Sequence, residues 1–144
     1  MEATNETLPV KKIALKHKII LGLFCIAGIG MWAESAYHKK AIEGHWLCSR
    51  ADGSTAGAFQ FDSDGNFLET DSRTEQFFGD YSVKGSTITT KIVGSTTHNI
   101  SYNESNPLIT TFDFIEKKGD RLLLKAWPIN KPMGVALSCV PFNS

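Results

Sequence analysis

The residue types that most often hold metals or act as nucleophiles are few in this chain of 144 residues. They are Cys25, Cys48, Cys139, His17, His38, His45 and His98. No cysteines have the Cys-x-x-Cys spacing, and no histidines are paired at the spacing of metal ligands. A Gly-x-Ser-x-Gly turn is also missing. These patterns predict no metal, no cofactor and no catalytic nucleophile.

Acidic residues are a second potential source of chemistry. The segment DSDGN at 62–66 is similar to the start of a calcium loop, but without a closing glutamate an Asp-Gly hairpin turn is expected. Glu69, Asp80 and Asp113 fall within predicted strands, where a carboxylate could face the interior of a barrel, but we expect each on the solvent face. Neither a phosphate-binding glycine loop nor the basic-aromatic pattern of nucleic-acid binders is present. The sequence therefore predicts neither an enzyme nor a nucleic-acid-binding protein.

An apolar run of fifteen residues, 19–33, follows a leader that contains Lys11, Lys12, Lys16 and Lys18. As a helix the run would be roughly 22 Å long, against a hydrocarbon core of about 30 Å. The lysines predict a leader that stays in the cytoplasm and a following chain that is exported. We expect an uncleaved signal-anchor. A cleaved signal peptide and a buried core helix are the alternatives.

This interpretation divides the chain into four parts. Residues 1–18 are a basic cytoplasmic leader, and residues 19–36 are one transmembrane signal-anchor, or a signal peptide, in the inner membrane. Residues 37–43 are a linker or a short helix, and residues 44–144 are an extracytoplasmic, periplasmic domain. If the leader is removed, the domain is free in the periplasm or secreted. The membrane is thus the first expected partner.

The cysteines become informative in an exported chain. Cys25 lies within the apolar run, where it acts as a small hydrophobic residue. Cys48 and Cys139 lie near the two ends of the exported part, and an oxidising compartment favours a disulfide between them. The bond would close a loop of roughly 90 residues and contribute about 4 kcal/mol. Two buried free thiols are the alternative.

After residue 44 the helical periodicity ends, and short apolar-polar alternations with turn residues between them begin. They predict strands over 44–50, 56–61, 66–71, 77–83, 86–93, 97–103, 108–115, 121–127 and 135–141. We expect an all-β fold, an antiparallel up-and-down meander of eight or nine strands that closes into a small barrel and leaves no exposed edges. A disulfide between the first and last strands fits this closure. An open two-sheet sandwich is the alternative.

Four segments carry a family resemblance: IEGHWLC (42–48), FQFDSDGNF (59–67), GDYSVKGSTITT (79–90) and GDRLLLKAW (119–127). They resemble the lipocalins and the small bacterial lipocalin-like domains of the calycin type. The resemblance implies a barrel whose floor is plugged by Trp46. The last predicted strand differs from the family pattern, because it has no arginine to stack on that tryptophan.

Two functions are compatible with these features. The first is a membrane-anchored binding module that engages a protein partner, as an inhibitor, an immunity protein or an envelope accessory protein. The alternative is a carrier of a small hydrophobic ligand. Its pocket, or simply the core, would be formed by Trp46, Phe59, Phe61, Phe67, Tyr81, Phe112 and Phe114. A cavity open at one end favours the carrier, whereas a filled interior with an apolar patch at 128–134 favours the protein partner.

Overall fold

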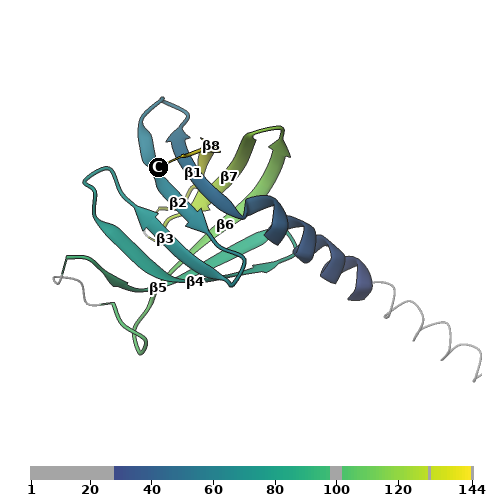
Figure 1. The fold of residues 1–144 in the computed structure, drawn as a ribbon, viewed down its shortest axis with the longest axis horizontal. Helices are drawn as coiled ribbons and strands as arrows, with labels where there is room; N and C mark the ends of the chain where they lie inside the picture. The colour runs from purple at the N-terminus through teal and green to yellow at the C-terminus, as the bar shows by residue number, and fades with distance from the viewer. Residues whose placement is uncertain (1–27, 98–101, 130, 144) are drawn as a thin grey trace, which may run out of the picture.

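The computed structural model describes residues 28–97, 102–129 and 131–143, and within them the chain forms one helix and eight strands (Figure 1). The helix covers residues 28–42. The strands are β1 (Gly44–Arg50), β2 (Thr55–Phe61), β3 (Asn66–Thr70), β4 (Gln76–Lys84), β5 (Thr87–Ser95), β6 (Leu108–Lys118), β7 (Arg121–Trp127) and β8 (Val135–Pro141). Each strand is antiparallel to the next, and β8 pairs with β1. The expected all-β meander and its closure into a barrel are confirmed.

Alternating side chains along the strands form the barrel interior. In β5, Ile88, Thr90 and Ile92 are buried, while the residues between them are partly exposed. Strand β7 follows the same pattern with Leu122 and Leu124. Because branched and aromatic residues pack well on a half-buried sheet, this period of two predicts these strands directly from the sequence.

A ninth strand was predicted at 97–103, and its described residues, 97, 102 and 103, are not part of the barrel. Residues 98–101 lie outside the described residues, and Asn103 forms only an isolated bridge with Asn106. Strand β5 instead pairs directly with β6, for example through Ile88 and Phe112. Residues 102–107 therefore belong to the connection between these two strands.

A disulfide joins the strands that close the barrel. Cys48 of β1 and Cys139 of β8 are direct register partners, with Cα atoms 4.0 Å apart, and their sulfur atoms are bonded. Both residues are fully buried. The expected pairing is confirmed, and the bond connects positions 91 residues apart.

The helix packs against one end of the barrel, the closed end. Ile42 is fully buried there, and His38 and Ala41 are nearly so. The Nδ1–H of His38 donates to the Gly85 carbonyl oxygen at 2.8 Å, and the Gly85 N–H donates to Ser35 Oγ at the same distance. These bonds tie the helix to the β4–β5 turn. Residues 37–42, expected as a linker or a short helix, are thus helical and packed on the barrel.

Half of the predicted membrane segment, 19–36, lies outside the described residues. The leader 1–18 and residues 19–27 of the apolar run belong to the part that is not described, and residues 28–36 are helical. Ile29, Met31 and Trp32 are exposed on this helix. The helical residues described here do not make up a segment both long and apolar enough to cross a bilayer.

Candidate ligand cavity

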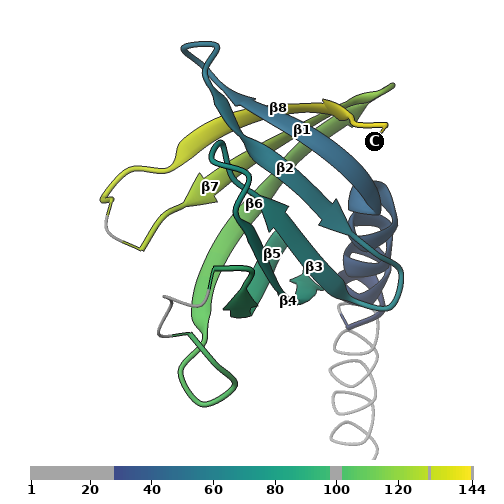
Figure 2. The ribbon, with the colours of Figure 1, turned by 60° about the vertical axis from the view of Figure 1, so that its left-hand side comes forward.

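The half of the barrel away from the helix contains a cavity of about 400 Å³. It lies toward the open end, the end that carries the β1–β2, β3–β4, β5–β6 and β7–β8 connections. Figure 2 shows the helix on the right and the long β5–β6 and β7–β8 connections on the left. The lining residues are Arg50, Ala56, Phe59, Glu69, Phe77, Ile92, Leu108, Thr110, Phe112, Ala126, Pro128, Ile129, Lys131, Val135 and Leu137. The cavity falls within the size range of small-molecule sites.

Side-chain size explains why only one half of the barrel is hollow. At the closed end, large inward-facing residues such as Trp46, Phe61 and Phe67 fill the space. Toward the open end, small residues such as Ala56 and Ala126 occupy part of the wall, so the side chains there leave space between them. The cavity is therefore a consequence of which residues occupy the inward positions.

Trp46 lies at the closed end beneath the last turn of the helix. Its side chain is 4% exposed, and its Nε1–H donates to the Ile42 carbonyl oxygen at 2.7 Å. Lys117 of β6 places its Nζ 5.2 Å from the centre of the indole ring, and the same Nζ donates to the Ala41 carbonyl oxygen at 2.9 Å. A cation thus contacts the tryptophan although the last strand has no arginine. The combined contacts fix the helix, β1 and β6 to one another.

The predicted aromatic set is divided between the cavity and the core. Phe59 and Phe112 line the cavity, with their ring centres 5.6 Å apart. Phe61 packs between Phe67 and Tyr81, each with its ring centre 5.1 Å away, deeper in the barrel. Trp46 and Phe114 lie outside the cavity lining, and Phe114 packs against His38 of the helix, with ring centres 4.2 Å apart.

Glu69 is the one carboxylate in the cavity lining, and its expected position on the solvent face was wrong. It lies two residues after the buried Phe67 in β3, so the strand alternation points both side chains inward. Burial, and secondarily the nearby Asp71 carboxylate, raises the pKa of Glu69 to about 7. The spacing Phe67-x-Glu69 was the signal in the sequence, but charged residues usually occupy the outer face of such strands.

Two cations lie at the mouth of the cavity. Arg50, at the end of β1, donates from Nη1 to the Thr55 carbonyl oxygen at 2.9 Å and to Ser54 Oγ at 3.2 Å. Lys131 belongs to the β7–β8 connection. Across the described ranges, neither cation forms an ion pair with Glu69. The half-buried Glu69 carboxylate therefore faces a largely apolar interior, while the positive charges remain at the rim.

The other acidic residues form turns and outer-surface contacts. Asp80 is exposed, and Asp113 accepts a hydrogen bond from Trp127 Nε1 at 2.7 Å on the outside of the barrel. Asp62 accepts hydrogen bonds from the Asn66 backbone and side chain, which lower the pKa of Asp62. The DSDGN segment is thus the expected hairpin turn. Among the residues with described positions, no three His, Cys, Asp or Glu side chains gather into a metal site.

The β7–β8 connection carries exposed apolar side chains beside the mouth. Ile129 is 62% exposed and also lines the cavity, and Met133 is 76% exposed. Exposed side chains of this size are commonly found at sites that contact a ligand or a partner. The cavity, which favours a carrier, and the exposed apolar loop, which favours a protein partner, therefore lie at the same end of the barrel.

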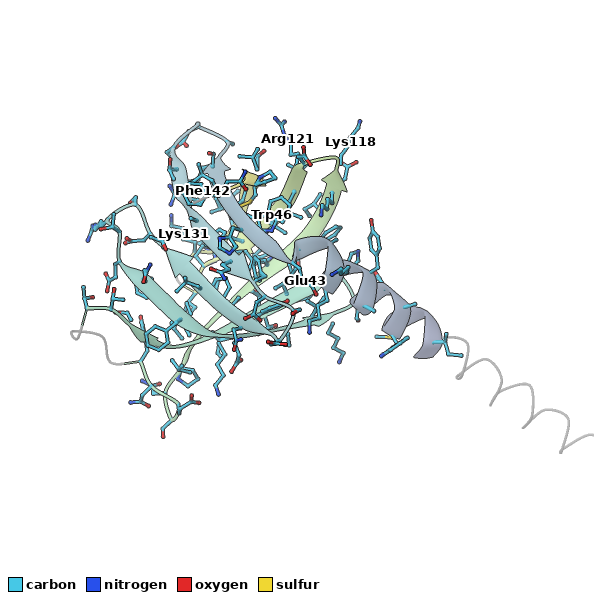
Figure 3. The ribbon with its side chains drawn as sticks, in the orientation of Figure 1. Glu43, Trp46, Lys118, Arg121, Lys131 and Phe142 are labelled. Atoms are coloured by element: carbon cyan, nitrogen blue, oxygen red, sulfur yellow. A yellow bond between two sulfur atoms is a disulfide. The ribbon has the colours of Figure 1, made fainter. Side chains whose placement is uncertain are left out.

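A second hollow, of about 540 Å³, lies outside the barrel at the closed end. Its wall includes Glu43, Trp46 and Phe142, which Figure 3 shows near the junction of the helix and the barrel. Most of its lining residues are exposed, including Lys117 and Asp120. It is a groove of the polar surface, and it has neither the apolar wall nor the buried charge of the interior cavity.

Comparisons of the chain with protein-family models, with curated proteins and with solved structures found no match. The closed antiparallel barrel is the architecture that the lipocalin resemblance implies, and the family itself stays a prediction.

Proposed function

We propose that this protein binds a small, largely apolar molecule inside its barrel, in the manner of a lipocalin-like carrier. The observation that carries the proposal is the cavity of about 400 Å³, which opens at one end and is lined mainly by apolar side chains. Sites of this kind bury most of a small ligand and use a few polar groups to orient it. Glu69 and Thr110 are the polar groups within the wall.

We further propose that residues 19–36 anchor the domain at the outer face of the inner membrane. The disulfide is consistent with an oxidising compartment. Because the helix packs on the closed end, a membrane at the start of this helix would leave the cavity mouth pointing away from the bilayer. A ligand would then enter from the extracytoplasmic side.

Filling the cavity with a larger side chain tests ligand binding. The uncharged fluorophore N-phenyl-1-naphthylamine, which brightens in apolar surroundings, is titrated into the full-length protein. Ala126→Phe places a ring into the cavity wall, and we expect it to reduce the affinity about tenfold or more, because the ring occupies the ligand's volume.

Ala136→Phe is the matched control, since Ala136 is exposed on β8, the strand that pairs with β7. It adds the same ring outside the barrel and should leave the affinity unchanged. The thermal unfolding of both variants is measured in parallel to confirm that each is folded. Equal binding by the wild type and both folded variants would show that the fluorophore does not use the cavity, and the proposal would fail.

A protein partner is the second candidate, and it rests on the exposure of Ile129 and Met133. Since Ile129 also lines the mouth, a partner bound to this loop would cover the entrance to the cavity. In that arrangement the barrel would deliver its ligand to the partner or receive it from there. Enzymatic activity is not proposed, because Glu69 stands in the cavity without a histidine, cysteine or second carboxylate in its lining.

A further inference from the structure

We propose that the cavity selects ligands that carry a protonated amine on an apolar body, and that Glu69 is the counter-ion of this amine. The inference rests on the proposed function, because it assumes that a small molecule occupies the cavity. It goes further by naming the chemical class of that molecule and the residue that recognises it.

The first argument is the position of Glu69. Its register partners are Phe59 on β2 and Phe77 on β4, and all three side chains line the cavity. Glu69 is half-buried, and in the described chain no protein group forms a hydrogen bond or salt bridge with its carboxylate, whose oxygens stay accessible from the cavity. Partial desolvation by the apolar wall still makes the charged form of this carboxylate costly, and an uncharged side chain would pack there at lower cost. A cationic ligand supplies the missing partner.

The second argument is the distribution of the other charges around Glu69. Arg50 is held by Ser54 and Thr55 at the mouth, and Lys131 lies on the β7–β8 connection. The Asp71 carboxylate accepts hydrogen bonds from the Arg73 and Glu75 backbone N–H groups in the β3–β4 turn. The remaining lining residues are apolar apart from Thr110. Among the charged lining residues that the structure describes, Glu69 is thus the one placed away from the rim, where a ligand group that enters the apolar interior can meet it.

The same arrangement distinguishes between ligand classes. A fatty acid would place its tail beside Glu69 and its head beside Arg50 and Lys131. An alkylamine would place its head at Glu69 and its tail along the apolar wall. A neutral alcohol would gain from neither charge. The order of affinities among an amine, an alcohol and a carboxylate of equal chain length therefore reports which charge is used.

Acid should weaken the binding of an amine. The pKa of Glu69, raised by burial and by Asp71, is about 7, so the carboxyl group is neutral in mild acid. An alkylamine remains protonated there and must displace that proton from Glu69. Its affinity should fall about tenfold for each unit of pH below the pKa of Glu69, whereas the affinity of an alcohol should not follow this pattern.

The test is isothermal titration calorimetry of the full-length protein at pH 8 with decylamine, 1-decanol and decanoate. We expect decylamine to bind most tightly and decanoate most weakly. Glu69→Gln should weaken decylamine about 30-fold or more, since a buried charge pair loses one member. Glu116→Gln removes an exposed carboxylate on β6 and serves as the matched control, with affinities unchanged.

The outcomes separate the two proposals. If the three compounds bind equally, or if decanoate binds best, and Glu69→Gln changes nothing, selection of amines is refuted while ligand binding stands. If each of the three compounds gives the same binding heat with folded Ala126→Phe as with the wild type, none of them enters the cavity. The proposed function itself then fails. A decylamine affinity that is constant between pH 5.5 and pH 8.5 would also overturn the role of Glu69.

Discussion

Replacing Cys48 with alanine should lower the free energy of unfolding by about 4 kcal/mol in oxidising buffer, because the unfolded chain loses the cross-link between Cys48 and Cys139. The disulfide joins β1 to β8, the pair that closes the barrel, and it spans 91 positions of the sequence. A constraint on so long a loop restricts the unfolded ensemble strongly. The effect is measured by equilibrium denaturation in urea with and without excess reductant.

Two further variants serve as controls, because each removes the same disulfide bond. Cys139→Ala and the double variant should lose the same stability as Cys48→Ala, since each removes the same cross-link. In excess reductant, all three variants should approach the reduced wild-type protein. Losses that add in the double variant, or that are equally large with reductant, would show that packing of the two buried sulfur atoms, and not the bond, stabilises the barrel.

Replacing Glu69 with glutamine should raise the free energy of unfolding at pH 8 by up to roughly 3 kcal/mol and leave it unchanged at pH 4. The ordinary pKa of 4.5 is raised to about 7 in the folded protein. Below pH 4.5 the carboxyl group is protonated in both the folded and the unfolded state, so it carries no penalty. Between pH 4.5 and 7 the unfolded state ionises first, and the stability of the folded protein falls.

The measurement is urea denaturation of the wild type and of Glu69→Gln at several pH values from 4 to 8. Glu116→Gln, at an exposed site, should change the free energy of unfolding little at any pH. If the free energies of unfolding of the wild type and of Glu69→Gln change in parallel with pH, the environment of Glu69 does not raise its pKa, and this account is contradicted. A stabilising substitution that weakens ligand binding is the behaviour expected of a functional residue.

The barrel was predictable from the sequence because its signals are local. Alternation of apolar and polar residues fixes each strand, and turn residues such as Asp64 and Gly65 mark the hairpins. The two cysteines mark the pair of strands that closes the sheet. The predicted strand at 97–103 has the same alternation, but β5 pairs directly with β6 from Thr87 to Ile92. Pairing, which decides between a strand and a connection, is not a local property.

The cavity was less predictable, because it depends on side chains from all eight strands at once. The buried aromatic residues suggested a pocket, yet only Phe59 and Phe112 of the set line it. The hollow is lined in part by small residues such as Ala56 and Ala126, which closure of the barrel brings to one cavity. Glu69 was assigned to the solvent face on the usual behaviour of charged residues, although its place two residues after Phe67 indicates the interior.

The most direct test of the central claim is to locate a bound ligand by nuclear Overhauser effects in the methyl-labelled, full-length protein. With N-phenyl-1-naphthylamine bound, we expect contacts from its aromatic protons to the methyl groups of Ile92, Leu108 and Leu137 in the cavity wall. Ile109, the neighbour of Leu108, is exposed outside the cavity and should show none. Contacts to Ile109 and other outer residues, without contacts to the three cavity residues, would contradict a ligand-binding interior.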